Sequence, residues 1–597
     1  MCGIAGIISL RGSALPEKNI ISKMLSEIRY RGPDDTGVLY EDDCYIGNNR
    51  LSIIDLETGN QPISANKGRY TIVYNGEVYN FKDIRSQLEK SGVKFKTKSD
   101  TEVILRGFIA RDIDILQELN GIFSFAIWDS KKHSLFLARD HMGIKPLYYF
   151  KNGKYFVFGS EIKSIFASGI CEKKFNRNAI FDYFCRQSPG YLDTMYDSIY
   201  ELQPGTWIKI NKTGDEQKGK YFSLENSWRE INSLPKNEKD ICLFVKEKIR
   251  ESVVRQLVSD VPVGVLLSGG IDSSILFNYM YGEYSSTSIH AFTYTNSGRN
   301  VNEIKKASSL VESIDHDIQH HILPVHINNH LNYFDEACRI LDSPVCYPSS
   351  VSILLLSRLA KKKGIKVVIS GQGADELFLG YERYFRWAKQ GLLNDRNMDN
   401  WAKCLYFGGG IDKIDFVESL TGQSRDYIED SVIYNWVHEF KDIPPLKRIS
   451  LFDQKFRLLD LLKRDDRMGM GGSVEIRVPF FDKEMVVYSN ALDDSWKMND
   501  LNQKYILKKI AKNILPDNIV NAPKMGSPTD IGAWLKTPEF ISLLIESVST
   551  EKSFSKNYLY FDKVQQIISK HERNFQFSHL CWCFFSMERW YQNSFLD

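Results

Sequence analysis

The chain has 597 residues, enough for two to four domains that each bury a core of their own. Lys and Arg total 77 against 75 Asp and Glu, so the formal net charge is +2, and 43% of the residues are hydrophobic. This composition excludes a chain that is mainly disordered. So balanced a charge gives no long-range field for a nucleic acid or an anionic membrane, and we expect neither as a partner.

Ten cysteines are scattered along the chain without the paired CxxC spacing of a zinc site or the density of a disulfide framework. They indicate reduced thiols in a cytoplasmic protein. The longest uncharged stretch, Asn574 to Met587, is shorter than the roughly 20 apolar residues of a transmembrane helix. We expect no signal peptide, because the first motif begins at residue 2.

The first part of the chain, to about Phe222, is predicted to be built from sheet. Its clearest runs of alternating hydrophobicity are Thr71 to Val78, Gly121 to Trp128 and Ser134 to Ala138. Asn152-Gly153 separates two aromatic-rich runs, which predicts a hairpin with a type I′ turn. Residues 211–235 carry charge, Ser, Asn and Gly and predict a connection between domains at 1–210 and 236–597.

Beyond the connection, strands alternate with helices, which is typical of a parallel sheet with crossover helices. The predicted elements are, in chain order, a strand at Val263 to Leu267, a helix at Ile271 to Tyr281, a strand at His290 to Thr295, a helix at Val351 to Lys363 and a strand at Ile365 to Ile369. From about Arg383 the pattern is mostly helical.

Cys2 directly follows the initiator Met1. Loss of Met1 would leave Cys2 with a thiol and a free α-amine, whose pKa near 8 lets it accept the thiol proton without a separate histidine. Taken alone, Cys2 is better interpreted as an arbitrary second residue without a function. Its interpretation therefore depends on the motifs that follow.

Six short motifs follow one another in order. They are Met1-Cys2-Gly3-Ile4-Ala5-Gly6, Arg31-Gly32-Pro33-Asp34-Asp35, Asn49-Arg50-Leu51-Ser52, Tyr74-Asn75-Gly76-Glu77-Val78-Tyr79-Asn80, Asp100-Thr101-Glu102 and Ala138-Arg139-Asp140. Together they resemble the glutaminase domain of class II, N-terminal-nucleophile glutamine amidotransferases over about the first 210 residues. The family often has His at the position of Tyr30 and Arg at that of His141; we assign neither position to chemistry.

The resemblance implies an α+β fold, the N-terminal-nucleophile αββα sandwich, and hydrolysis of glutamine. Cys2 would attack the side-chain amide of glutamine, with its own amine as the base. The Asn75 side chain and the Gly76 N–H would form the oxyanion hole, which stabilises the charge that develops in the tetrahedral intermediate. The alternative for Asn75-Gly76 is a plain turn.

The resemblance also implies how the substrate is held. Arg50 would pair with the α-carboxylate of glutamine through its planar fork, and Glu77 and Asp100 would hold the α-ammonium. Taken singly, Arg50 could be a surface salt-bridge residue and Asp100 a helix N-cap. For all of these alternatives to hold at once, several motifs would have to match the family by coincidence.

A glycine- and serine-rich loop joins the strand at 263–267 to the helix that follows. In Ser268-Gly269-Gly270-Ile271-Asp272-Ser273-Ser274 the glycines let the backbone approach a phosphate, and the helix N-terminus presents unpaired N–H groups. No Gly-Lys-Ser/Thr ending follows, so it is not a Walker A loop. The loop suits the pyrophosphate that leaves ATP, with Asp272 as a Mg²⁺ ligand, or it is an ordinary strand-to-helix turn.

Ser370-Gly371-Gln372-Gly373-Ala374-Asp375-Glu376 repeats this arrangement after the strand at 365–369. Two such loops at the carboxyl ends of strands place a ligand at the edge of the sheet. The region resembles the synthetase domain of asparagine synthetases, an α/β ATP-pyrophosphatase fold of the adenine nucleotide α-hydrolase-like type. Further matching segments are His320-His321, Asp466-Arg467-Met468, Val474 to Asp482, Lys504 to Lys508, Lys524 and Trp582 through Trp590.

The second resemblance implies ATP and Mg²⁺ as cofactors. Asp272 and Asp375 would bind Mg²⁺, and Lys504 would neutralise phosphate charge, its alternative being a solvated helix face shared with the lysines that follow. The implied ATP and pyrophosphate site consists of Leu267, Ser268, Gly269, Gly270, Asp272, Ser273, Ser370, Gly371 and Lys504. We assign no zinc to Cys581-Trp582-Cys583, which is more typical of a packed C-terminal helix.

The two domains together imply a glutamine- and ATP-dependent ligase. ATP would convert a carboxylate into an acyl-adenylate, and ammonia freed at Cys2 would cross an internal tunnel and displace AMP. A closed path keeps ammonia unprotonated and water away from the adenylate. The expected partners are glutamine, ATP and a carboxylate acceptor. A homodimer is one candidate assembly.

Aspartate, which would give asparagine, is the leading acceptor. Gln372 stands where asparagine synthetases commonly carry Glu, and Gln can hydrogen-bond but cannot act as a base. Gln372 is therefore our candidate for the acceptor site, and another carboxylate, such as a uronic acid of a surface polysaccharide, is the alternative. Residues 342–347 are expected to line the acceptor pocket or to form a plain loop. A regulatory binding protein without turnover is a third hypothesis, which the intact site residues disfavour.

Overall fold

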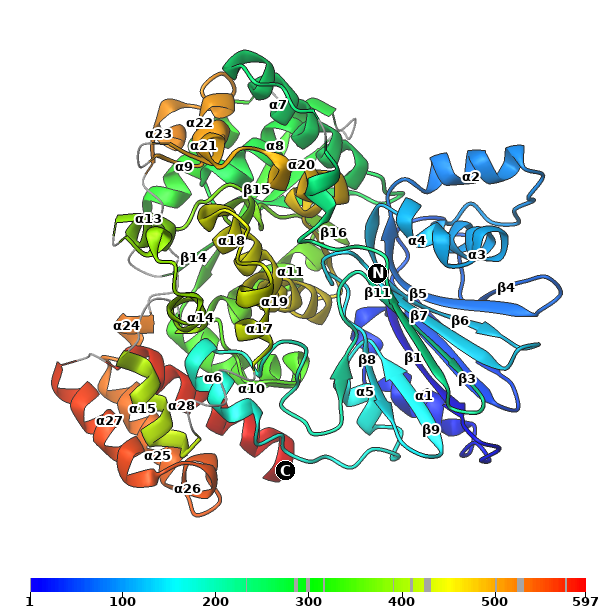
Figure 1. The fold of residues 1–597 in the computed structure, drawn as a ribbon, viewed down its shortest axis with the longest axis horizontal. Helices are drawn as coiled ribbons and strands as arrows, with labels where there is room; N and C mark the ends of the chain where they lie inside the picture. The colour runs from blue at the N-terminus through cyan, green and yellow to red at the C-terminus, as the bar shows by residue number, and fades with distance from the viewer. Residues whose placement is uncertain are drawn as a thin grey trace.

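Two lobes make up the molecule (Figure 1). The N-terminal lobe, blue and cyan, is rich in strands, and the larger second lobe mixes helices with one sheet. The computed structural model describes residues 2–231, 233–283, 288–296, 301–314, 317–389, 391–407, 412–423, 431–499, 502–522, 531–574 and 577–596.

The N-terminal lobe contains two six-stranded antiparallel sheets. In the first sheet the order is β10 (Tyr200–Glu201), β8 (Tyr148–Lys151), β9 (Tyr155–Gly159), β1 (Cys2–Ser9), β3 (Cys44–Arg50) and β2 (Asp35–Tyr40). In the second it is β12 (Glu216–Lys220), β11 (Thr206–Asn211), β7 (Ser134–Arg139), β6 (Gly121–Asp129), β5 (Tyr70–Val78) and β4 (Ile63–Ala65). The three strands expected at 71–78, 121–128 and 134–138 are thus confirmed.

The two sheets pack face to face, with helices on the outside. Between them lies a core of inward-facing strand residues, among them Ile4, Ile8, Ile46, Val73, Ala126 and Leu137. Helices α1 (Asn19–Ser26) and α5 (Ile162–Phe166) cover the first sheet, and α3 (Asp100–Arg111), backed by α2 (Phe81–Lys90), covers the second. Burial of apolar area at about 25 cal/mol per Å² stabilises these layers. The predicted αββα sandwich is confirmed.

The predicted hairpin is present, but its turn is of another type. Tyr148 pairs with Gly159 and Lys151 with Phe156. Neither Asn152 nor Gly153 has the positive φ that a type I′ turn requires. Instead the Asn152 side chain accepts hydrogen bonds from the N–H groups of residues 154 and 155, at 2.9 and 2.8 Å. A side-chain turn therefore replaces the left-handed backbone.

Strand β12 lies inside the segment 211–235, where we expected a connection. It pairs antiparallel with β11 and adds an edge strand to the second sheet. The short helix η3 (Ser227–Glu230) follows. The second lobe then begins with α7 (Glu238–Gln256), whose N-cap Asn237 accepts a hydrogen bond from the Asp240 N–H at 3.0 Å.

The second lobe is built on five parallel strands. Their order is β15 (Ile318–Val325), β14 (Ile289–Asn296), β13 (Val263–Leu266), β16 (Val367–Ile369) and β17 (Glu475–Arg477). The chain runs outward from β13 through β14 and β15 and then returns to the other side of β13. Strands β13 and β16 therefore flank the point where the strand order reverses, which is where open α/β sheets bind ligands. The predicted parallel sheet is confirmed.

Helices surround this sheet. After α7 they include α8 (Ile271–Glu283), α9 (Val301–Glu312), α10 (Ile327–Leu341), α11 (Ser349–Lys362) and α12 (Ala374–Leu377). Helices that follow include α13 (Glu382–Lys389), α14 (Met398–Phe407), α15 (Asp412–Thr421), α17 (Val432–Glu439), α18 (Pro445–Phe452), α19 (Leu458–Gly471), α20 (Lys483–Ala491), α22 (Tyr505–Ala511), α25 (Pro538–Ser549), α27 (Phe561–Asn574) and α28 (Ser578–Tyr591). None of the helices in the described ranges has the length and apolar character needed to cross a membrane.

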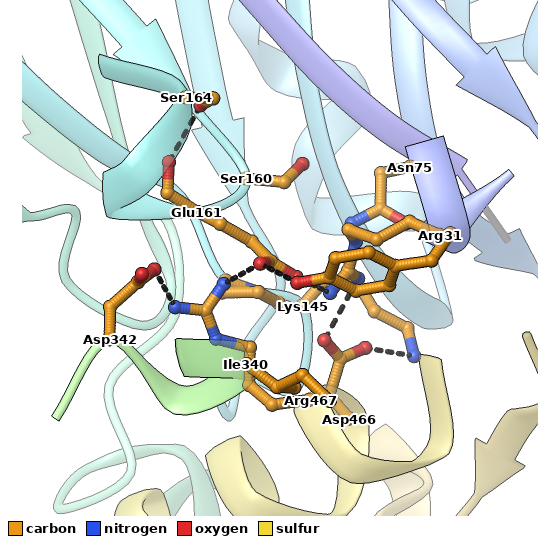
Figure 2. A network of polar contacts seen from close by, with 12 residues as sticks. Arg31, Asn75, Lys145, Ser160, Glu161, Ser164, Ile340, Asp342, Asp466 and Arg467 are labelled. Atoms are coloured by element: carbon orange, nitrogen blue, oxygen red, sulfur yellow. Dashed lines mark hydrogen bonds and ion pairs between the residues drawn. The ribbon is translucent and has the colours of Figure 1, made fainter. Parts of the chain in front are cut away.

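A network of buried charges joins the two lobes (Figure 2). Arg31 of the first lobe donates to Glu161, at 2.9 Å, and to Asp466 of α19, at 2.8 Å. Lys145 of the first lobe donates to the same Asp466 at 3.1 Å. Burial raises the pKa of the Asp466 and Glu161 carboxyls, but the surrounding cations outweigh it and hold both values below the ordinary range. Ion pairs of this kind fix one lobe against the other.

Candidate active sites

Cys2 is the first residue of β1 and is almost fully buried. Its N–H donates a hydrogen bond to Oδ1 of Asn75 in the facing sheet, at 3.1 Å, and its carbonyl accepts one from Arg31 Nε, also at 3.1 Å. Met1 lies outside the described residues. After removal of Met1 the same nitrogen would be an α-amine on the residue that carries the thiol.

Asn75 and Gly76 belong to β5 and pair with Ser124 and Phe123 of β6, so they do not form a turn. The buried Nδ2 of Asn75 has no hydrogen-bond partner among the described residues. A buried unpaired donor is costly unless a ligand supplies the acceptor. At Gly76 a Cβ would lie 2.2 Å from the Ile122 carbonyl oxygen, so the close approach of β6 requires glycine.

Asp100 lies at the start of α3, but Ser99 is the N-cap of that helix. The Asp100 carboxylate instead accepts hydrogen bonds from the Tyr74 hydroxyl at 2.8 Å and from the Val78 N–H at 3.1 Å. Burial raises the pKa of Asp100, although these hydrogen bonds oppose the shift.

Glu77 brings a second buried carboxylate to the same strand end. Burial raises its pKa well above the ordinary value, and the negative charges of Asp100 and Glu475 raise it further. Its Oε2 has no hydrogen-bond partner in the described parts of the chain. Two neighbouring buried acids favour a cationic ligand, because a cation offsets both desolvation and mutual repulsion.

Arg50 supplies the positive charge of this site. It ends β3, lies opposite Cys2 in the register of the sheet and is 4% exposed, so it is not a surface salt-bridge residue. Its guanidinium donates to Asn60 Oδ1 at 2.5 Å and to the carbonyls of Ile54 and Asp55 at 3.2 and 2.6 Å. The α-carboxylate of an amino acid requires a cation and its α-ammonium requires an acid, and this site provides both.

Gln61 also reaches this site, which the sequence motifs did not predict. Its Oε1 accepts a hydrogen bond from the Tyr74 N–H at 2.7 Å, and its Nε2 lies 4.0 Å from the Cys2 sulfur. No short motif marks this residue. It reaches Cys2 only through the pairing of β4 with β5.

The second site lies where β13 gives way to α8. The hydroxyls of Ser268 and Ser273 are 3.0 Å apart, and the Gly270 N–H donates to Ser268 Oγ at 3.3 Å. Gly269 has a φ of +75°, and a Cβ there would lie 2.4 Å from the Glu303 carbonyl oxygen. Hydroxyls and the N–H groups of a helix start therefore converge at one place, as phosphate binding requires.

The second glycine-rich loop packs against the first. A Cβ at Gly371 would lie 2.9 Å from the Ser273 nitrogen. The parallel pairing of β13 with β16 sets this proximity. The structure thus brings the two loops together at the reversal point of the sheet.

Lys504 connects the two acidic residues of these loops. Its Nζ lies 2.5 Å from Asp272 Oδ2 and 2.7 Å from Asp375 Oδ1. Burial lowers the pKa of Lys504, but the two carboxylates outweigh it and raise the value above the ordinary one. Lys504 precedes α22 with a φ of +55° and is buried, unlike Lys508 and Lys512, so it does not lie on a solvated helix face.

The residues at this point fit a magnesium ion. Asp272 Oδ1 is buried and has no hydrogen-bond partner among the described residues. Magnesium is usually bound by one or two carboxylates together with phosphate and water oxygens. Elsewhere, the described ranges contain no group of three or more His, Cys, Asp or Glu side chains that could hold a metal ion.

Comparison with known proteins identifies the family. A family model described as glutamine amidotransferase domain matches residues 1–222, and one described as asparagine synthase matches residues 245–592. The chain belongs to the asparagine synthetase family. The predicted enzyme class, a carbon–nitrogen ligase that takes its nitrogen from glutamine, is confirmed.

Several relatives span most of this synthetase. Asparagine synthetase [glutamine-hydrolyzing] 3 of Bacillus subtilis (strain 168) is 32% identical and covers 90% of each chain. Asparagine synthetase [glutamine-hydrolyzing] 1 of the same organism is 30% identical over 96% of this chain and 93% of the relative. Amidase chry2 of Gibberella zeae is 26% identical over 88% of each.

Residues 342–344, 346 and 347 line a cavity between the lobes. The segment 342–347, which we expected to line an acceptor pocket, is called the acceptor loop below. Tyr148 and Ile162 of the first lobe and Lys463 and Arg464 of α19 form other parts of the cavity wall. Gln372 is not part of this lining; its N–H donates to Ser370 Oγ at 3.3 Å. The structure therefore separates our two acceptor-site candidates.

The C-terminal helix α28 holds the acceptor loop. Trp582 Nε1 and Ser586 Oγ both donate to the Val345 carbonyl, at 3.0 Å. Trp582 belongs to a matching segment of the sequence, whereas Lys524 lies outside the described residues. The packed helix expected at Cys581-Trp582-Cys583 is confirmed.

Two of the positions at which the sequence departs from the usual family residues, Tyr30 and His141, lie between the lobes. The Tyr30 hydroxyl donates to Glu161, which is also bound by Arg467 of α19. His141 Nε2 lies 2.9 Å from the Phe481 carbonyl oxygen of the second lobe. These residues therefore contribute to lobe packing.

We predict that the KM of the synthetase for glutamine rises as the pH falls from about 8 to about 5. Because burial raises the pKa values of Glu77 and Asp100, both carboxyls become protonated at a higher pH than free carboxyls do, and a protonated carboxyl no longer attracts the substrate ammonium. Steady-state glutaminase kinetics across this range measure the effect.

In that experiment Glu77→Gln should raise KM at pH 8 and weaken its pH dependence. Asp129→Asn, which removes a carboxylate paired with Arg69 away from the site, serves as the control and should keep the wild-type profile. A wild-type KM that is constant across the range would contradict the role given to the two acids.

Proposed function

We propose that this synthetase hydrolyses glutamine at Cys2 and transfers the ammonia to an ATP-activated carboxylate, with aspartate as the acceptor. The observation that carries the proposal is the presence of both sites in one chain. One site places Asn75, Arg50 and Glu77 around a buried cysteine, and the other joins two glycine-rich loops through Lys504.

The first half-reaction begins with the α-amine of Cys2, which takes the proton of its own thiol. The sulfur then attacks the side-chain carbonyl carbon of glutamine, and the oxyanion accepts hydrogen bonds from Asn75 Nδ2 and the Gly76 N–H. The amine returns its proton to the leaving nitrogen, and the C–N bond breaks to give ammonia and a thioester. Water hydrolyses the thioester to glutamate and restores the thiol.

The second half-reaction activates the acceptor. An oxygen of its carboxylate attacks the α-phosphorus of ATP, and the bond to pyrophosphate breaks. Ser268, Gly270 and Ser273 would bind the departing pyrophosphate, and Lys504 would neutralise part of its charge. When bound by Asp272 and Asp375, Mg²⁺ would neutralise further phosphate charge. Ammonia then attacks the acyl carbon, AMP leaves, and loss of a proton gives the amide.

Another carboxylate is the second candidate acceptor. Gln372 replaces the Glu that asparagine synthetases commonly carry, and a relative that spans most of the chain is named an amidase. A uronic acid of a surface polysaccharide would use the same activation chemistry. We further propose that the protein acts in the cytoplasm and assembles as a homodimer.

A screen of acceptors tests the proposed function. The enzyme is supplied with ATP, Mg²⁺ and glutamine and with aspartate or a uronic acid in turn, and AMP, pyrophosphate and product mass are measured. Aspartate should give all three products, including one with the mass of asparagine. Turnover with the uronic acid alone would replace aspartate as the acceptor, and the absence of both glutamate and pyrophosphate would support a binding protein.

We predict that Cys2→Ala abolishes glutamine hydrolysis, because the sulfur forms the thioester, while amide synthesis from added ammonium salts persists. Glutamate and pyrophosphate release measure the two activities separately. Cys44→Ala is the matched control, since Cys44 is also buried at a strand of the same sheet, and it should keep both. Glutaminase activity that survives Cys2→Ala would refute the assignment.

The opposite pattern is predicted for Lys504→Met. Loss of the buried ammonium should reduce pyrophosphate release by at least about 100-fold, within the range for removal of a group that stabilises transition-state charge. Basal glutamine hydrolysis should persist. Lys508→Met, one helical turn away and partly exposed, should leave both activities near wild type. Equal pyrophosphate release by the two variants would remove Lys504 from the phosphate site.

A further inference from the structure

Glu161 is a buried carboxylate to which the proposed reaction gives no role. It is fully shielded from solvent and accepts hydrogen bonds from the Tyr30 hydroxyl, Lys163 Nζ and Arg31 Nη1, the last at 2.9 Å. Arg467 Nη1 of α19 lies 2.9 Å from Oε2, the oxygen that Tyr30 and Lys163 also contact, whereas Arg31 contacts Oε1. Three hydrogen-bond donors of the first lobe and one guanidinium of the second thus meet at one side chain. Figure 2 shows Arg31 and Arg467 on either side of Glu161.

On one side, Glu161 connects to the nucleophile through Arg31. The three guanidinium nitrogens of Arg31 have three different acceptors: Glu161, Asp466 and the carbonyl of Cys2, the last at 3.1 Å. Because the guanidinium is planar and rigid, its nitrogens cannot move independently. The position of the Glu161 carboxylate therefore helps to set the position of the Cys2 backbone.

On the other side, Glu161 connects to the acceptor loop. The second terminal nitrogen of Arg467 donates to Asp342 Oδ2 at 2.5 Å, and Lys163 Nζ lies 3.2 Å from Asp342 Oδ1. Asp342 Oδ2 also accepts a hydrogen bond from the N–H of Ile162, the residue after Glu161, at 2.9 Å.

Asp342 is the first residue of the acceptor loop. It ends α10 in the left-handed conformation, with a φ of +54°, so its backbone reverses where the loop leaves the helix. A shift of this loop around a bound acceptor would be passed to its carboxylate and from there to Arg467 and Lys163.

We propose that Glu161 is a positioning residue for Cys2, which transmits the occupancy of the acceptor cavity to the glutaminase site through Asp342, Arg467 and Arg31. The inference rests on the proposed function, because it takes Cys2 as the nucleophile and residues 342–347 as the acceptor loop. Charge-assisted hydrogen bonds in a dry interior are strong and geometrically demanding, which suits such a relay. Glutamine would then be consumed fastest when an acceptor is present to receive the ammonia.

The test measures how far ATP and acceptor stimulate glutamate formation in Glu161→Gln. A coupling between two sites is typically worth about 5- to 150-fold. We expect the stimulation in this variant to fall by at least about fivefold, while pyrophosphate release driven by ammonium salts stays within about twofold of wild type. A merely structural role would lower both activities together.

Glu225→Gln is the matched control. Glu225 is also buried and also pairs with a cation of the second lobe, Lys455, at 2.5 Å, and it accepts a hydrogen bond from Trp436 Nε1 at 3.0 Å. Its carboxylate is not part of the contacts that run from Arg31 to Asp342. The control should therefore keep the wild-type stimulation.

Unchanged stimulation in Glu161→Gln, or a wild-type enzyme whose glutaminase is not stimulated at all, would overturn the inference. Absence of glutamine hydrolysis in the wild type would overturn the proposed function instead. If Glu161→Gln fails to fold, Arg467→Lys decides, since it keeps the buried charge but a single ammonium cannot hold Glu161 and Asp342 as a guanidinium fork does. Wild-type stimulation in Arg467→Lys would then refute the relay.

Discussion

The arrangement of both sites depends on the pairing of buried charges between the lobes. The first lobe supplies Arg31, Lys145 and Glu161, and α19 of the second supplies Asp466 and Arg467. An unpaired ion costs several kcal/mol to bury, so such charges are tolerated only when partners of opposite sign are present. Removal of one lobe would leave charges of the other without their partners. The two lobes therefore specify each other's position, and with it the relation between the two sites.

Helix α19 connects the cavity beside the acceptor loop with the lobe that carries Cys2. Its residues Lys463 and Arg464 line the cavity beside the acceptor loop, whereas Asp466 and Arg467 contact the lobe that carries Cys2. Because an α-helix rises only 1.5 Å per residue, the residues that line the cavity and those that contact the first lobe are close neighbours on one helix. The same helix therefore contributes to the wall of the cavity and to the interface with the first lobe.

Local pattern and motif order predicted most of the fold, and the structure brings most of the candidate site residues together in two places. The alternating runs became strands of the sandwich, and the loops with Asp272 and Asp375 met because parallel strands end at one edge. The type I′ turn was wrong because the Asn152 side chain caps the turn instead. Glu161 and Gln61 could not be found in this way: their partners lie far away in the chain, and no local periodicity records which distant groups a buried side chain will meet.

The acceptor loop is held by a different kind of structure from the residues proposed for glutamine and ATP. The residues proposed for glutamine and ATP lie on strands and at helix starts, where the sheet registers fix them. The acceptor loop has no such register; Trp582 and Ser586 of α28 hold it from outside, and Asp342 anchors its beginning. Loops tolerate change better than the elements that they connect. Substitutions in this loop are therefore better tolerated than substitutions in the strands that hold Asn75 and Arg50.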